Sequence, residues 1–371
     1  MEGSALLDAI ASAPDDDEPR LVYADWLSQR GEPQGELIAL QVRLARADAD
    51  DVVLPERARV EAGIRSLLKA HAGTWCARLL SITPAIFTFR RGLVEHAAEL
   101  NFASAEALLD HAPLLRAARV KPAAFHSLIM NEASSRFEEL RFEDLSIDIQ
   151  QLMRLEERLE GGRLRSLDFE APFLDDRPPH RLATWPVAVE HFGVSQKAHK
   201  GVQLGATFLS RFASAPKRDR LRSLRFERLD FGRVDQPATL FALESLALID
   251  CQLSRQFGNL AKIVTAMPGL RSLEVQKDRI TLDELAEVVA ACPEMRRLRL
   301  RSLDLESVEV LLPWARTLRR LDLMGNPLGE DGAKRIIETE WPHLMELRLR
   351  TTRLKVQTKS ALQARFGDVF S

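Results

Sequence analysis

The feature that most constrains the fold of this chain is a frame of three apolar residues, spaced as positions one, four and six, that recurs along most of its length. The middle residues of successive frames lie 22 to 27 residues apart, except for one step of 57 residues that spans about two periods. A fixed period in this range indicates small units that stack and bury their apolar edges against their neighbours. The middle residues are Ala118, Leu140, Leu167, Leu224, Leu246, Leu273, Leu298, Leu321 and Leu347.

A second apolar position supports the same period, because it follows the third residue of the frame by five positions in every unit from Leu140 onward. Its members are Ile147, Leu174, Phe231, Leu253, Ile280, Leu305, Leu328 and Leu354. Two residues before it, a polar side chain could satisfy backbone groups of a turn. Asn326 and Cys251 fit that role, whereas Leu145, Pro172, Leu229 and Leu303 do not. The pattern is therefore regular in its apolar positions and degenerate in its polar ones.

Helix signals lie between the frames, as in the capping box of Thr281 and Glu284, so each unit is predicted to be a strand followed by a return helix. The segment 321–336 resembles the ribonuclease-inhibitor type of leucine-rich repeat, with Asn326, Gly329 and Gly332 at the positions that type uses. This resemblance implies an α/β leucine-rich-repeat horseshoe, or solenoid, of about ten units, with parallel strands on the concave face and helices outside.

The step of 57 residues predicts an irregular region near 172–205. Residues 172–186 carry four prolines and the acidic pair Asp175 and Asp176, which favours a loop insertion on the rim. A degenerate unit is expected near 190–205, and residues 206–216 resemble the helix that precedes the next strand.

The segment that precedes the repeats has a different residue pattern. Helices are predicted over 20–30, 35–46 and 55–68, with Asp17 as N-cap and Pro19 at the first position of the first of them. Tyr23, Asp25 and Trp26 could form an exposed recognition surface. The alternative is a small core of Leu21, Val22, Trp26 and Leu27, with Asp25 paired to Arg20 or capping the next helix.

Residues 19–27 and 31–38 resemble the bacterial repeat-companion domain, and Arg91–Glu95 is similar to a segment that accompanies it. The resemblance implies a small all-helical N-terminal module ahead of leucine-rich repeats, and it implies no activity, catalytic residue or cofactor. The predicted organisation is a helical module at 1–48, a linker and connecting helix at 49–80, a solenoid at 81–356 with the irregular insertion near 172–205, and a C-terminal cap at 357–371.

Signatures of chemistry are not found in the sequence. It contains no GxSxG, GxxxxGK[ST], GxGxxG or HExxH motif. The run Asp15–Asp17 lacks the spacing of an EF-hand loop, and His180, His191 and His199 match no common zinc pattern. Cys76, Cys251 and Cys292 are expected to be small buried residues. We therefore expect no catalytic, cofactor-binding or metal-binding residues, and no enzyme.

The strand residues that flank the buried frame positions should face solvent. In the last three units they comprise six arginines and two acids, a surplus of +4, whereas the units at Leu140 and Leu167 carry one arginine and four acids. This polarity predicts either partner recognition by an acidic protein surface or ordinary solubilising residues. The predicted partner-binding residues are Arg297, Arg299, Arg301, Arg320, Arg348 and Arg350.

A net charge of −2 and the absence of aromatic residues from that face argue against nucleic acid as the partner. No apolar run approaches the length of a membrane-spanning helix and no basic leader begins the chain, so a cytoplasmic protein without membrane contact is expected. The leading hypothesis is a non-enzymatic protein–protein interaction scaffold that binds through the concave face. The alternative, by fold analogy with leucine-rich-repeat activators of GTPases, is a regulator of a nucleotide-dependent switch protein.

Overall fold

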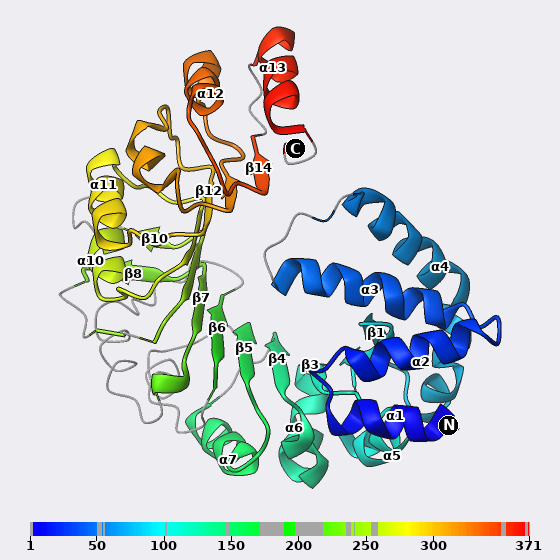
Figure 1. Cartoon of the computed structure of the whole chain (residues 1–371). Helices are drawn as coiled ribbons and strands as arrows, with labels where there is room; N and C mark the ends of the chain where they lie inside the picture. The colour runs from blue at the N-terminus through cyan, green and yellow to red at the C-terminus, as the bar shows by residue number, and fades with distance from the viewer. Residues whose placement is uncertain are drawn as a thin grey trace. The chain divides into compact units, whose positions relative to one another are not determined.

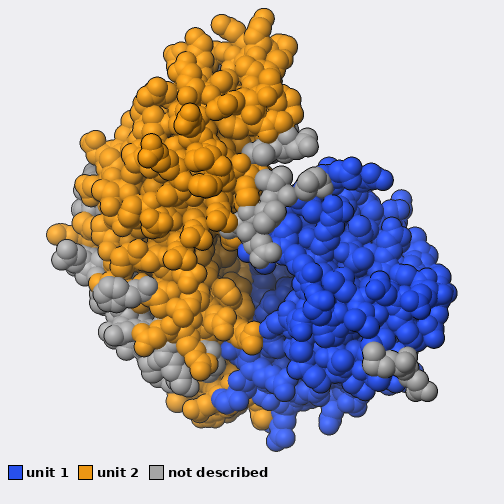
Figure 2. All heavy atoms as spheres, in the orientation of Figure 1, with its two compact units in different colours: residues 1–143, 161–164 blue, residues 144–160, 165–371 orange. Residues whose placement is uncertain are grey.

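The computed structural model describes residues 3–49, 54, 56–100, 102–144, 148–170, 189–196, 218–234, 239–240, 242–253, 259–349, 354–367 and 370. These residues form a mixed α/β structure with a large, mostly parallel and open sheet (Figure 1). The chain divides into two compact units, which are coloured separately in Figure 2. Unit 1 comprises residues 1–143 and 161–164, and unit 2 comprises residues 144–160 and 165–371.

Unit 1 begins with four helices and continues with short strands. The helices are α1 (Gly3–Ser12), α2 (Glu18–Ser28), α3 (Gln34–Ala49) and α4 (Arg57–Ile82). An antiparallel hairpin of β1 (Ile86–Arg90) and β2 (Leu93–Ala98) follows, and β3 (Ala117–Val120) and β4 (Glu139–Glu143) extend the sheet in parallel. The connections contain α5 (Ala105–His111) and α6 (Pro122–Met130), with 3-10 turns at Phe102–Ser104 and Glu132–Arg136. The predicted helices are present, and the last of them runs on to Ile82, well past its expected end.

The apolar core of unit 1 combines helical residues with the hairpin. One cluster contains Leu6, Tyr23, Leu27 and Ile38 and is completed by Leu93 of β2 and by Leu114. Gly92 at the hairpin turn has a φ of +82°, and a Cβ there would lie 2.1 Å from the Ile38 side chain, so only glycine allows the turn to approach α3. The α2 helix is therefore mostly a core element: Tyr23 is 8% exposed, although Val22, predicted to belong to this core, is 47% exposed.

Unit 2 contains α7 (Ile149–Leu159) and a run of parallel strands in the order β5-β6-β7-β9-β11-β12-β13-β14. Their bounds are Ser166–Glu170, His191–Ser195, Ser223–Glu227, Ser245–Ile249, Ser272–Gln276, Arg297–Arg301, Arg320–Asp322 and Glu346–Arg348. Two short strands, β8 (Asp230–Gly232) and β10 (Gln252–Leu253), pair separately. Helices follow the later strands: α10 (Asn259–Thr265), α11 (Leu282–Ala291), α12 (Gly329–Glu338) and α13 (Val356–Phe366), with 3-10 turns at Arg218–Arg220 and Glu309–Trp314.

The frame residues of unit 2 lie in one register across the sheet. Each middle residue pairs with the middle residue of the next strand, and all are at most 2% exposed. Their order is Leu167, Phe192, Leu224, Leu246, Leu273, Leu298, Leu321 and Leu347. Phe192 belongs to β6, which lies inside the step of 57 residues, at the start of the stretch where a degenerate unit was expected. The predicted strand phase is confirmed for the described strands.

The second apolar position is also buried wherever it is described: Phe231, Leu253, Ile280, Leu305, Leu328 and Leu354 are each at most 9% exposed. Ile147 and Leu174, the predicted loop at 172–186 and the predicted helix at 206–216 lie outside the described residues.

A left-handed backbone conformation recurs after several strands, always two residues beyond the third frame residue. We call this residue the corner position. Its φ lies between +53° and +79° at every member named here. The members are Asp144, Arg228, Asp250, Lys277, Ser302 and Gly325. Five of the six are not glycine, so the sequence carries no marker for this bend.

The residue that follows the corner position, which we call the turn slot, carries polar groups that hydrogen-bond to the backbone of the preceding strand segment. Asn326 Oδ1 accepts hydrogen bonds from the Leu303 and Leu305 amides at 2.9 and 3.3 Å, and Nδ2 donates to the Leu300 carbonyl at 2.6 Å. Cys251 Sγ lies 3.5 Å from the equivalent carbonyl of Phe226. As expected from the sequence, both side chains serve backbone groups of a turn.

Asp278 occupies the same slot, which the sequence reasoning missed. Its Oδ1 accepts from the Leu253 amide at 3.1 Å and the Arg279 amide at 2.8 Å. Its Oδ2 is buried without a hydrogen-bond partner among the described residues, where Asn326 places an N–H donor. Burial raises the pKa of Asp278 to about 7.

Candidate functional site

The strand face of β11–β14 carries charged side chains in two rows that the parallel register defines. The first row is Ser272, Arg297, Arg320 and Glu346, and the second row is Glu274, Arg299, Asp322 and Arg348. Burial alternates along β11, β12 and β14, and Leu321 is buried in β13, so the leucines and Val275 lie in the core and these rows lie on the opposite face. The described residues among the predicted partner-binding arginines are thus brought together, and Arg350 lies outside the described residues.

The second row alternates in charge and pairs within itself. Arg299 Nη1 lies 3.0 Å from Glu274 Oε2, and its Nε lies 3.5 Å from Asp322 Oδ2. Arg301, one position further along β12, also donates to Asp322, and this hydrogen bond raises the pKa of Arg301. Arg299 and Arg301 are therefore held by carboxylates of neighbouring strands, whereas Arg348 contacts Glu346 of its own strand.

Asp322, which flanks Leu321 on β13, corrects the expectation that the strand residues beside the buried frame positions face solvent. It is only 6% exposed, because Arg299 and Arg301 lie over it. Its Oδ1 also accepts from the Met324 amide at 3.2 Å. Leu321 itself is buried, as predicted.

The charge of this face is smaller than the sequence count suggested. Five described arginines (297, 299, 301, 320 and 348) stand with three carboxylates, those of Glu274, Asp322 and Glu346, which leaves +2. The sequence count of +4 included Arg350 and stopped one strand short of Glu274. At the β5–β7 end of the same face, Asp168, Glu170 and Glu227 outnumber Arg225, so the polarity along the face is retained.

A hollow of about 240 Å³ opens on this face. Its lining includes Ser272, Arg297 and Arg320 of the first row and Glu274, Arg299 and Asp322 of the second. Pockets for drug-sized ligands and cofactors are usually larger, roughly 300–1,000 Å³, and predominantly apolar. The hollow suits a single polar side chain better than a cofactor.

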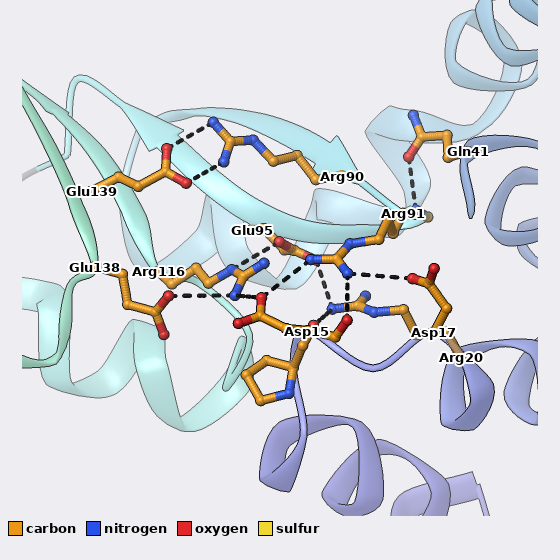
Figure 3. A network of polar contacts seen from close by, with 12 residues as sticks. Asp15, Asp17, Arg20, Gln41, Arg90, Arg91, Glu95, Arg116, Glu138 and Glu139 are labelled. Atoms are coloured by element: carbon orange, nitrogen blue, oxygen red, sulfur yellow. Dashed lines mark hydrogen bonds and ion pairs between the residues drawn. The ribbon is translucent and has the colours of Figure 1, made fainter. Parts of the chain in front are cut away.

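Unit 1 holds a different charged cluster, drawn in Figure 3. Arg20 of α2 and Glu95 of β2 lie 2.8 Å apart, and both side chains are completely buried. Arg116 Nε contacts the other carboxylate oxygen of Glu95 at 3.0 Å, and its Nη1 contacts Asp15 at 2.6 Å. Burial alone would lower the pKa of Arg116, but Asp15 and Glu95 outweigh it and the pKa is raised. Arg20 pairs with Glu95 rather than with Asp25, as had been considered.

The rest of this cluster ties the hairpin to the helices. Arg91 lies 3.3 Å from Asp17. Asp17 occupies the N-cap position of α2, as predicted, but its side chain makes no cap hydrogen bond there. Gln41 Oε1 of α3 accepts from the Gly92 amide at 2.7 Å. Every charge of the cluster faces an opposite charge inside unit 1, so we assign it a structural role.

The remaining candidates offer little chemistry. All three cysteines are buried, and burial raises the pKa of Cys251 to about 12 and that of Cys292 to about 11, which disfavours a thiolate nucleophile. Within the described part of the chain, no group of three or more histidine, cysteine, aspartate or glutamate side chains could hold a metal ion. None of the described helices has the length and apolar character needed to cross a membrane.

No model of a known protein family matches the chain, and no curated protein matches it.

Proposed function

We propose that this chain is a non-enzymatic scaffold that binds a protein partner through the strand face of a leucine-rich-repeat solenoid, with a companion-type helical module at its N-terminus. The observation that carries the proposal is the register of β11–β14, which gathers half-exposed arginines around the hollow. Arginine is a favoured anchor at protein interfaces because its long stem packs and its guanidinium makes several directed hydrogen bonds.

The two ends of the face support a protein rather than a nucleic acid as the partner. The β5–β7 end is acidic and the β11–β14 end is basic, a polarity that would fix the orientation of a partner of complementary charge. A phosphate backbone would meet the carboxylates of Glu274, Asp322 and Glu346 among the arginines, and these would repel it. A cytoplasmic location is part of the same proposal.

The experiment that tests the proposal blocks the face without changing its charge. Ala247 lies on the same face of β9, in register with Glu274, and its substitution by Trp places a bulky group there. Ala286 is an exposed residue of α11, and Ala286→Trp is the matched control. Each protein is immobilised and exposed to a lysate of the source cells. We expect a partner to be retained by the wild type and by Ala286→Trp and lost with Ala247→Trp. Retention by all three proteins, or by none, would contradict the scaffold role of this face.

A further inference from the structure

We propose that a row of residues just before the strands of unit 2 includes a second binding surface, which takes a short acidic segment of a protein. The inference goes beyond the proposed function and does not depend on it, because these residues lie outside the strands. The residue two positions before each middle frame residue forms the row, and we call it the entry position. From Glu190 onward, the amide of each entry residue donates to the carbonyl of the entry residue one strand earlier, at 2.7–2.9 Å. The backbone therefore holds the row in register across the sheet.

The charges of this row alternate in its first part and not in its second. The entry residues in strand order are Arg165, Glu190, Arg222, Glu244, Arg271, Arg296, Arg319 and Met345. Arginine and glutamate alternate up to Glu244, and the next three entry residues are all arginines, which we call the arginine stripe. Adjacent strands lie about 4.8 Å apart, so the three backbones span only about 10 Å. Three positive charges this close repel one another, and an anion beside them removes that cost.

The side chains of the stripe are not neutralised by contacts within the chain. None of the three makes a hydrogen bond or an ion pair with another residue in the part of the chain that the structure describes. Arg271 is exposed, and Arg296 and Arg319 are half-buried. Glu294 lies two residues before Arg296, is exposed and pairs with none of them. The stripe therefore differs from the strand face, where the arginines contact carboxylates.

The two ends of the stripe favour a short acidic segment over a continuous polyanion. Glu244 borders it on one side and the uncharged Met345 on the other. A nucleic-acid backbone that ran along the row would pass the arginines and meet the carboxylate of Glu244. In an extended peptide, residues at alternate positions point to one side and lie about 7 Å apart, so two or three carboxylates at that spacing match the stripe. A guanidinium donates two parallel hydrogen bonds to a carboxylate, so each arginine can hold one.

The test is a titration of a fluorescein-labelled peptide with the full chain, followed by anisotropy. The peptide carries three glutamates at alternate positions among glycines and serines. Arg271→Gln/Arg296→Gln/Arg319→Gln should weaken binding by about tenfold, because it removes three charge-assisted contacts. A peptide with glutamine in place of glutamate should not bind.

Two further variants separate the stripe from the overall charge. Arg154→Gln/Arg279→Gln/Lys359→Gln removes three positive charges from exposed positions on α7, after β11 and on α13, and should change affinity less than about twofold. Glu244→Gln removes the negative charge beside the stripe and should tighten binding about twofold, whereas Glu157→Gln, an exposed acid of α7, should leave it unchanged.

Three outcomes would overturn the inference: no binding of the glutamate peptide to the wild type, an equal loss in both triple variants, or tighter binding of a labelled single-stranded DNA that carries three phosphates. Ala247→Trp, which blocks the strand face, should leave the peptide affinity unchanged. A loss as large as that of the stripe variant would place the peptide on the strand face instead. The capture experiment thus tests the strand face and the peptide titration tests the stripe, so that either can fail alone.

Discussion

The two units use the same pair of side-chain types, arginine and carboxylate, in opposite ways. In unit 1, Arg20 and Glu95 are fully buried and joined by Arg116, so α2 and β2 are linked by charges that water does not reach. In unit 2, Arg299, Arg320 and Arg348 keep between 28% and 42% of their side chains exposed. Arg299 and Arg320 contact carboxylates of neighbouring strands, and Arg348 contacts Glu346 of its own strand. The same chemical pair thus forms a buried structural link in one unit and a half-exposed charged strand face in the other.

Burial decides the difference. Removing one member of a buried pair leaves its partner charged in a medium of low polarity, whereas a half-exposed partner turns to water at little cost. Asp278 of unit 2 is a buried acid whose carboxyl accepts hydrogen bonds from backbone amides rather than from a cation, and burial favours its protonated form. The comparison therefore has three cases: buried and paired, buried and protonated, and exposed.

The buried pair of unit 1 should show the largest effect. Glu95→Gln keeps the shape of the side chain but removes its charge, leaving Arg20 and Arg116 facing each other, so we expect a loss of about 3–5 kcal/mol in the free energy of unfolding. A urea titration measures it. Arg20→Met/Glu95→Met removes both charges and should recover most of the loss. A loss below about 1 kcal/mol in Glu95→Gln would show that the pair is not a structural link.

The protonated acid of unit 2 should show a pH-dependent effect. The folded-state pKa of Asp278 is about 7 against an ordinary 3.8, and Asp250 and Glu284 nearby raise it further beyond the effect of burial. The folded chain therefore holds a proton that the unfolded chain has lost between about pH 4 and 7, so stability falls as pH rises through that window. The loss should be on the order of 2–4 kcal/mol by pH 8.

Two exchanges in the turn slot isolate this contribution. Asp278→Asn supplies an N–H donor as Asn326 does, and should remove the decline while leaving stability near pH 4 almost unchanged. Asn326→Asp should introduce a decline of the same sign, since it buries a titrating acid in an equivalent position. Thermal unfolding followed across this pH range checks both variants. Identical pH profiles for the wild type and Asp278→Asn would refute the assignment.

Asp322 should show an intermediate effect, because its carboxylate is buried while its arginines are partly exposed. Asp322→Ala is expected to cost about 1–2 kcal/mol, through the loss of hydrogen bonds to Arg301 and to the Met324 amide. Chemical denaturation measures this cost. A value below about 0.5 kcal/mol would restore the view of Asp322 as a surface residue.

The smallest effect is expected at Arg348, whose pair with Glu346 is exposed on both sides, at 41% and 30%. Arg348→Ala should change the free energy of unfolding by less than about 0.5 kcal/mol in the same denaturant series. A loss as large as that of Asp322→Ala would remove the distinction between buried and exposed pairs on this face.

The sequence predicted the apolar skeleton of unit 2 well, because an alternating strand buried on one face must repeat its large residues at fixed positions. Leu273 and Leu321 needed no knowledge of their neighbours. Phe192 was harder to place, since its frame is made of Val189, Phe192 and Val194 rather than leucines, and only the irregular spacing indicated the region.

The polar contacts could not be predicted in the same way. Arg20 and Glu95 are 75 positions apart and meet only because the hairpin of β1 and β2 packs on the helices. The alternation of buried and exposed strand positions placed Asp322 on the correct face. It gave no information about the hydrogen bond to Asp322 from Arg301 on the neighbouring strand β12. Two features of the sequence could have improved the prediction. Counting the charges of the strand that contains Glu274 would have lowered the expected charge of the face, and accepting aspartate in the turn slot would have identified Asp278.

The corner position has a consequence for how this chain tolerates mutation. Positions such as Asp144, Lys277 and Ser302 are exposed and polar, so their side chains look freely replaceable. Their positive φ nevertheless restricts which residues the backbone can accept. Glycine or asparagine would be accepted, while valine, isoleucine or threonine would force a branched Cβ against the backbone. Substitution at these surface sites is therefore limited by the branching of the side chain near the main chain rather than by its polarity. The same limit applies to every strand segment that ends in a corner position with positive φ.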